Sequence, residues 1–276
     1  MNLLYLEATL NNLRAQWPHA WPGMALVVRN ALAQLGWHDD APLAPRDRAL
    51  HDCMFSVIAA IEADGQHRAA HHQEPQYHNR LHFADAVVSL TVLLATERQI
   101  AGRRPADAPP SHAEWLGMLT VVSHDFLHNG QINQFRSEIE TLSVQALTPY
   151  MKQHKVHKDD QALIGSMILK TDPAFVAESH QSIAGLPFDV SDPRCLLVLI
   201  QECDILASSL PTTGVSLTQQ LSDEWAKVAP DRSQSLLTSK GRLFFLKHMA
   251  LFSSPSSRLL GIQATIDQQI AELEQA

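Results

Sequence analysis

The sequence predicts an all-α protein, and three observations lead to that fold class. Apolar residues recur at helical spacing along most of the 276 residues, as in helices that bury one face. Runs of alternating β-branched residues that end in an Asn-Gly or Gly-Gly turn, the usual sign of a β-hairpin, are not found. Helix start signals, in which a capping residue precedes proline, occur at Asp172-Pro173, Asp192-Pro193 and Ser254-Pro255.

The N-terminal part predicts a layer of three helices within residues 1–65. Apolar periodicity places them at 3–17, 24–35 and 48–63. Trp21-Pro22-Gly23 and the segment 42–45, which has a proline at each end, provide the breaks between them. A polar stretch at 66–76 follows the third helix.

The segment 79–99 is apolar on most of its circumference, so we expect a buried central helix there. The Pro- and Ala-rich loop at 102–110 ends at Ser111 and Glu114, whose S-x-x-E spacing is a capping box. The helix that starts there runs into His124. A last helix is expected at 254–275.

Composition and charge limit the class of protein. Hydrophobic residues make up 45% and charged residues 18%, which is typical of a globular chain, and without a low-complexity linker we expect one domain over 1–276. The net charge of −8 argues against a nucleic-acid polymer as partner. No apolar run approaches the ~18 to 20 residues of a membrane span, and the N-terminus lacks the features of a secretion signal. We therefore expect a cytoplasmic protein without a membrane partner.

Cysteine and histidine usage is the next observation. Cys53, Cys195 and Cys203 match no disulfide framework and lie in apolar helical patterns, so we expect them to be buried thiols. Histidine is overrepresented, with 15 residues against three tyrosines. Some of these histidines are therefore expected to have a chemical role.

Three segments combine histidine or cysteine with carboxylates inside apolar helices, namely 77–85, 124–128 and 202–204. At ~100° per residue, His82 and Asp85 lie about 60° apart, and His124 shares one face with Asp125 and His128. Asp204 has no Lys or Arg three or four residues away. A lone buried carboxylate costs several kcal/mol, so these acids need cationic partners.

A cation bound between the helices would neutralise these buried carboxylates. His82, His124, Asp125 and Asp204 supply two imidazoles and two carboxylates, a set suited to zinc, manganese or iron. Asp125 has a second oxygen that can bridge to a harder ion such as magnesium or manganese. A hydroxide between two metals attacks phosphorus, so hydrolysis of a phosphate ester is the expected chemistry. The alternative is a buried ion-pair network without metal.

Two longer motifs narrow the chemistry. They read Tyr77-His78-Asn79-x-x-His82-x-x-Asp85 and His124-Asp125-x-x-His128-x-Gly130-x-x-Asn133. The adjacent His-Asp pair resembles the HD superfamily of metal-dependent phosphohydrolases, and both motifs closely resemble the signatures of class I cyclic-nucleotide phosphodiesterases. The similarity continues through Ser137-x-x-Glu140, Ile168-Leu169-x-Thr171-Asp172 and Cys203-Asp204-Ile205, and so covers a catalytic core at roughly 70–250.

The resemblance implies a role for each matching residue. His82, His124, Asp125 and Asp204 would bind the tighter metal, and Asp125 would also reach the second. His128, Glu140 and Thr171 would hold waters of the second ion or the bridging hydroxide. His78 would be the general acid, which agrees with its place just before the helix start at Asn79. Asp85 would orient a metal ligand rather than bind the ion.

The sequence departs from this family where the base is recognised. The family's base-contacting asparagine corresponds to Ala207, and its purine-binding glutamine corresponds to Gly241 or Arg242. We therefore expect a small phosphate ester, a cyclic nucleotide or a related nucleotide, without a defined base. Arg242 could contact a second phosphate or a carboxylate, and Phe245 either stacks on a base or packs in the core.

Two other functions remain open at this point. An HD-type di-iron oxygenase would need further histidines before Asp204, and His154, His157 and His180 are available. A catalytically inactive nucleotide-binding module would keep the metal ligands without turnover. The N-terminal helices could cover the core, close the pocket or form a homodimer.

Overall fold

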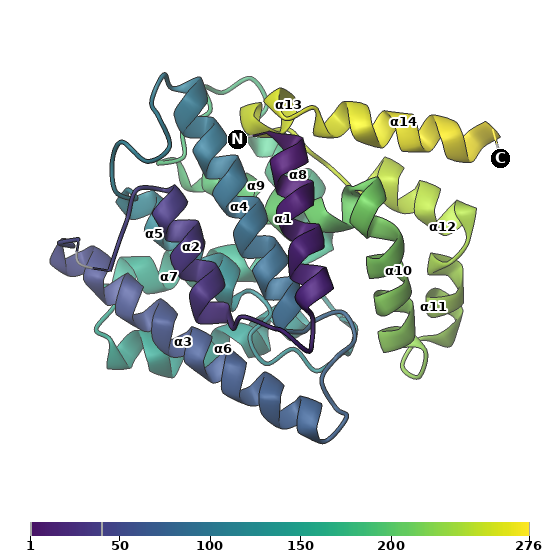
Figure 1. Ribbon diagram of the computed structural model, residues 1–276, viewed down its shortest axis with the longest axis horizontal. Coiled ribbons are helices and arrows are strands. Elements are labelled where there is room, and N and C mark those ends of the chain that lie inside the picture. Colours follow the sequence, from purple (N-terminus) through teal and green to yellow (C-terminus); the bar gives the residue numbers. More distant parts are fainter. Residues whose placement is uncertain (1, 40, 276) are drawn as a thin grey trace.

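The computed structural model describes residues 2–39 and 41–275, which form fourteen α-helices and no strand (Figure 1). The all-α prediction is therefore confirmed. At the centre lies α4, Arg80–Ile100, in which every residue from Arg80 to Arg98 is buried. It packs against α2 (Met24–Gln34), α5 (His112–Ser123) and α9 (Pro193–Ser209), as expected of a helix that is apolar nearly all round.

The expected N-terminal helices are present as α1 (Leu3–Gln16), α2 and α3 (Pro45–Ala70). The third is longer than the predicted 48–63, at both ends. Pro45 occupies the first helical position, where its missing N–H costs nothing. At the other end, Arg68 pairs with Asp64 one turn earlier at 2.7 Å, and Gly65 is buried against Arg80. A local ion pair and a contact with α4 therefore stabilise this polar segment in helical form.

The middle of the chain forms a second set of helices, of which the first two pack beside α3 and α5 and the last packs against α9. These are α6 (Glu138–Gln153), α7 (Lys158–Leu169), a 3₁₀ turn at Pro173–Phe175 and α8 (Val176–Ser182). The capping predictions are confirmed: Ser111 and Glu114 form the capping box, and Asn79, Asp172, Asp192 and Ser254 each accept a backbone N–H at a helix start.

The C-terminal helices lie beside this bundle, on the right of Figure 1. They are α10 (Pro211–Trp225), α11 (Pro230–Leu236), α12 (Ser239–Phe244) with a π-helical turn at Phe245–Met249, α13 (Pro255–Leu259) and α14 (Ile262–Gln275). The prediction of one helix over 254–275 is wrong. Gly261, with φ of +73°, breaks it, because this left-handed conformation ends α13 before α14 begins.

A buried acid anchors the segment that leads into α13. Glu202 on α9 accepts the N–H groups of Ser253 and Ser254 at 2.6 and 2.8 Å, and also the hydroxyls of Ser254 and Ser257. These donors satisfy a carboxylate with no exposed surface. The C-terminal helices are therefore attached to the same helix that carries Asp204.

The surface and the cysteines fit the composition. All three cysteines are free and buried, as predicted.

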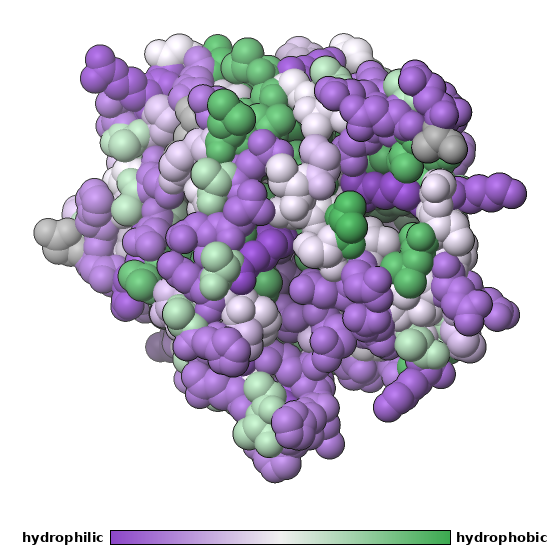
Figure 2. Space-filling model, turned by 45° about the vertical axis from the view of Figure 1, so that its right-hand side comes forward, coloured by the Kyte–Doolittle hydropathy of each residue, from purple (hydrophilic) through white to green (hydrophobic). Residues whose placement is uncertain are grey.

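On the face shown in Figure 2 the surface is mainly hydrophilic, and its hydrophobic patches are small and separate. Among the residues described, no single helix has the length and apolarity to cross a bilayer; α9 and α10 pass that test only as a pair, and they are bent by 92°.

Candidate metal and catalytic site

Four side chains from α4, from α9 and from the turn after α5 converge at the centre of the fold. His82 of α4 lies with Nε2 3.2 Å from Nε2 of His124, at the end of α5. Both nitrogens face the carboxylates of Asp125 and Asp204, at distances between 3.1 and 3.3 Å. One atom from each of the four residues lies within 4.8 Å of the others. The structure thus brings together the four residues that the sequence proposed as ligands.

The geometry of these atoms fits a shared cation. Zinc binds imidazole nitrogen and carboxylate oxygen at about 2.0 to 2.2 Å, so neighbouring ligand atoms of a tetrahedral site are about 3.3 Å apart. The measured separations of 3.1 to 3.3 Å match that spacing. Two imidazoles and two carboxylates also suit manganese and iron.

The pKa shifts of these four residues show that positive charge is stabilised within the cluster. Burial alone would lower the pKa of His82, but hydrogen bonds to Asp125 and Asp204 raise it to about 9. The pKa of His124 also rises well above its usual value, because the two carboxylates outweigh its burial. The pKa values of both acids fall well below their usual range despite burial, mainly through His124. A divalent cation would supply the charge that two protonated imidazoles provide otherwise.

Local contacts fix the orientation of the two histidines. Nδ1 of His124 donates to the carbonyl of Val121 at 2.7 Å, which leaves Nε2 to face the cluster. The Asn79 side chain caps α4 and accepts the N–H groups of Leu81 and His82. The helix that carries His82 therefore begins at a fixed position beside the site.

His78 lies at the edge of the cluster and is held by a residue that the sequence did not identify. Its Nδ1 lies 2.5 Å from Oε1 of Glu224 on α10, and its Nε2 lies 4.0 Å from Oδ2 of Asp125. Oε2 of Glu224 also accepts the N–H groups of Tyr77 and His78, at 2.7 and 3.0 Å. Burial would raise the pKa of Glu224, but the charge and hydrogen bonds of His78 lower it to about 2.

His128 lies directly against His78. The two rings stack with centroids 3.7 Å apart and planes 21° apart. Gly130 N–H donates to Nδ1 of His128 at 3.0 Å, so the neutral ring carries its proton on Nε2. Burial, with the charge of His78 added, lowers the pKa of His128 to about 3. His128 is therefore a neutral hydrogen-bond donor at physiological pH.

His78, His128 and Glu224 also come within metal-binding distance of one another. Their arrangement is that of a hydrogen-bonded group rather than a second metal centre. The nitrogen lone pairs of two stacked rings run nearly parallel and do not converge on one ion. In addition, Nδ1 of His78 is already engaged by Glu224.

The remaining proposed residues of this region are placed as follows. Both oxygens of Asp85 accept from Arg14 of α1, at 3.0 and 2.6 Å, and among the described residues no hydrogen bond joins Asp85 to the four-residue cluster. Glu140 is buried and accepts from the Asn133 side chain, and burial raises its pKa to about 7. The Thr171 hydroxyl donates to the carbonyl of Ile168 at 2.8 Å.

Arg242 and Phe245 lie at the end of α9 rather than against the cluster. The Arg242 guanidinium donates to the carbonyl of Ser208 and to Oε1 of Gln269, both at 2.7 Å. It also lies over the Phe245 ring at 5.4 Å. A cation at a helix C-terminus satisfies terminal carbonyls and the helix dipole, so this geometry explains Arg242 as a cap of α9.

The three histidines considered for a di-iron site bond elsewhere. His154 contacts the Ser56 hydroxyl, His157 caps α7, and His180 contacts the Ser253 hydroxyl. None belongs to a metal-binding group among the described residues.

The chain was compared with known proteins by sequence and by structure, and only solved structures resemble it. No protein-family model matches the chain, and no curated protein matches it in sequence. Its structure is similar to LmjPDEB1 in complex with IBMX, at 14% identity and a TM-score of 0.68 over 96% of this chain and 90% of that one.

Two structures from the choanoflagellate Salpingoeca rosetta are also similar. The phosphodiesterase domain of the RhoPDE fusion protein is 15% identical, with a TM-score of 0.59 over 100% of this chain and 92% of that one. The phosphodiesterase domain of the rhodopsin phosphodiesterase is 14% identical, with a TM-score of 0.57 over 100% and 88%. The all-helical fold is therefore that of phosphodiesterase domains.

Proposed function

We propose that this chain is a metal-dependent phosphodiesterase that hydrolyses a small phosphate ester, either a cyclic nucleotide or a related nucleotide. The observation that carries the proposal is the convergence of His82, His124, Asp125 and Asp204 within 4.8 Å. It occurs on a fold shared with two structures described as phosphodiesterase domains. The two motifs that supply three of these residues resemble those of class I cyclic-nucleotide phosphodiesterases.

Two divalent ions complete the proposed site. His82, His124, Asp125 and Asp204 would hold zinc, manganese or iron, and Asp125 would share its second oxygen with magnesium or manganese. When bound, such a pair supplies an activated hydroxide and neutralises the charge of a phosphate ester.

Three residues of the chain itself hold and direct the protons that the reaction needs. His78 carries the proton for the departing ester oxygen on Nε2, the nitrogen that faces Asp125. Glu224 accepts from the other ring nitrogen and stabilises the protonated ring. His128, which accepts the Gly130 N–H at Nδ1 and carries its proton on Nε2, would donate a hydrogen bond to a water or hydroxide beside Asp125. Glu140 and Thr171 would hold further waters.

At the two positions that correspond to the family's purine-binding glutamine, Gly241 and Arg242, no side chain is free to contact a base. A Cβ on Gly241 would lie 2.0 Å from the backbone oxygen of Ser235, so a side chain is not accommodated there. Arg242 is engaged at the end of α9. The site therefore favours recognition through the phosphate ester, and Arg242 would contact a second anionic group only after leaving Ser208.

A direct test uses purified protein loaded with zinc, manganese or iron in the presence of magnesium. Hydrolysis is measured on cyclic mononucleotides, cyclic dinucleotides and an aryl phosphodiester, and bound metals are quantified in the same sample. We expect metal-dependent release of a phosphomonoester from at least one of these substrates. Oxygen consumption by a two-iron form without ester hydrolysis would contradict the proposal.

A further inference from the structure

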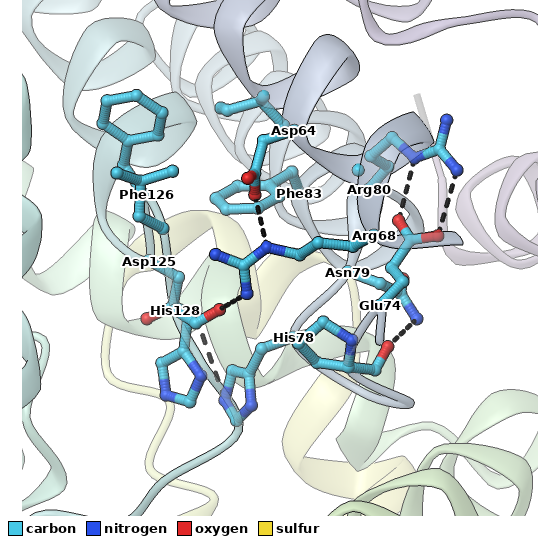
Figure 3. Close-up of a pocket in the computed structure, with 14 residues that line it drawn as sticks. Asp64, Arg68, Glu74, His78, Asn79, Arg80, Phe83, Asp125, Phe126 and His128 are labelled. Carbon is cyan, nitrogen blue, oxygen red and sulfur yellow. Dashed lines mark hydrogen bonds and ion pairs between the residues drawn. The ribbon is translucent and has the colours of Figure 1, made fainter. Parts of the chain in front are cut away.

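The last two turns of α3 reach the loop that carries His128. Arg68, in the segment that extends α3 beyond the predicted end, donates from Nη1 to the carbonyl of His128 at 3.1 Å. Its Nε lies 2.7 Å from the Asp64 carboxylate one turn earlier. Figure 3 shows this guanidinium between Asp64 and the backbone of His128, close to His78 and Asp125.

The loop backbone at this point is held by a local hydrogen bond and by a distant donor. The His128 N–H donates to the Asp125 carbonyl at 2.8 Å in the turn after α5, which ends at Ser123. Leu127 inside this turn adopts φ of +64°, a left-handed conformation that costs free energy for a residue with a branched side chain, and 47% of it is exposed. The charged donor on the His128 carbonyl adds to the turn hydrogen bond and stabilises this conformation.

The end of α3, which carries Arg68, is packed against the start of α4. A Cβ on Gly65 would lie 2.5 Å from Cδ of Arg80, so the Arg80 side chain lies directly against the α3 backbone at Gly65. Arg80 in turn donates to Glu62 and Glu74, at 2.6 and 2.8 Å. The end of α3 is thereby fixed to α4, beside the segment that carries His78.

A small cavity of about 20 Å³ lies between these parts. It is lined by Arg68, His78, Asp125 and His128 among others, and has room for about one water molecule.

We propose that Arg68 is a positioning residue, which holds the His128 peptide so that the His128 ring stays stacked on His78 beside Asp125. Gly130 N–H reports on the same arrangement, because it donates to Nδ1 of His128. The inference rests on the proposed function for its effect on turnover, but the effect on the loop is independent of any substrate.

The test compares Arg68→Ala and Arg68→Lys with Arg29→Ala. Arg29 forms an ion pair with Asp39 at 3.1 Å on the exposed side of α2, which makes it a matched control away from the site. We expect Arg68→Ala to lower kcat by about 10- to 100-fold with KM and metal content unchanged. Arg68→Lys should recover part of kcat, since one ammonium donates to the His128 carbonyl without the fork to Asp64. Arg29→Ala should match the unmodified protein.

Amide hydrogen exchange at Gly130 is the second measurement, and it needs no substrate. We expect faster exchange in Arg68→Ala and intermediate exchange in Arg68→Lys. Unchanged kcat and unchanged Gly130 exchange in Arg68→Ala would overturn the inference. So would a loss of kcat that only follows a lower Tm and is not recovered by lysine. If the unmodified protein hydrolyses no ester while Gly130 exchange rises in Arg68→Ala, the proposed function fails and the positioning role stands.

Discussion

Glu224 holds His78 by its ring and by its backbone, although 146 residues separate the two in the chain. One carboxylate oxygen lies 2.5 Å from the ring Nδ1, and the other accepts the His78 N–H at 3.0 Å. The ring of the proposed general acid therefore cannot rotate without the loss of a charge-assisted hydrogen bond. Its second nitrogen stays directed at Asp125.

Replacement of Glu224 by glutamine should separate this orientation from metal binding. The amide oxygen still accepts one N–H, but it does not stabilise a protonated ring, so we expect kcat to fall by about 10- to 100-fold. Steady-state kinetics and metal analysis of the same sample provide the measurement. Full activity in Glu224→Gln would contradict the role given to this pair. Asp223→Asn, which changes the exposed neighbour, is the control.

The metal cluster and the general acid should also be separable. Asp204→Ala removes one of the four converging ligands, so we expect loss of tight metal and of turnover together, about 100-fold or more in affinity. His78→Ala should keep the metal and lose most of the rate. Quantification of bound metal after dialysis distinguishes the two variants. An Asp204→Ala protein with normal metal content would show that the cluster does not bind the ion.

Metal uptake should depend on pH in a defined direction. The pKa of His82 in the metal-free protein is raised to about 9, so its charge stabilises the fold below pH 6.5, and this contribution is lost as pH rises through about 9. A metal ion binds only the neutral imidazole, and binding near pH 7.5 must therefore release protons and strengthen as pH rises. Calorimetry in two buffers of different ionisation enthalpy measures this release. Uptake without proton release would contradict the protonated cluster.

The Arg14 to Asp85 pair should be a large contribution to stability. Only 2% of the Asp85 side chain is exposed, so removal of the guanidinium leaves a buried charge without its partner. We expect Arg14→Ala to lower the free energy of unfolding by about 3 to 5 kcal/mol. The double variant with Asp85→Asn should recover much of this loss, and urea denaturation of all three proteins checks it. Arg29→Ala, in an exposed pair, should cost less than about 1 kcal/mol.

The ligand cluster could be predicted from the sequence because burial of charge is visible locally. Asp204 lies among apolar residues without a basic neighbour on its helix, and in the structure its partners are His82 and His124, as expected of an acid that needs a distant cation. Capping residues such as Asn79 are equally local, since cap and helix start are adjacent. The all-helical fold followed from the same periodicity.

Contacts between distant segments could not be predicted in this way. No spacing in the sequence links Glu224 to His78, which lies 146 residues away. Arg14 and Arg68 resemble ordinary charged positions of exposed helix faces until the fold brings them to Asp85 and His128. Apolar periodicity does not predict the extension of α3, because its polar residues are stabilised by the Asp64 to Arg68 pair and by contacts with α4 and the loop.

The order of the four proposed metal ligands along the chain has a consequence for biosynthesis. His82, His124 and Asp125 emerge from the ribosome long before Asp204, which α9 supplies near the last quarter of the sequence. A nascent chain without α9 would therefore offer an incomplete set of donors. The full set of four would form only when α9 packs against α4, as it does in the folded protein.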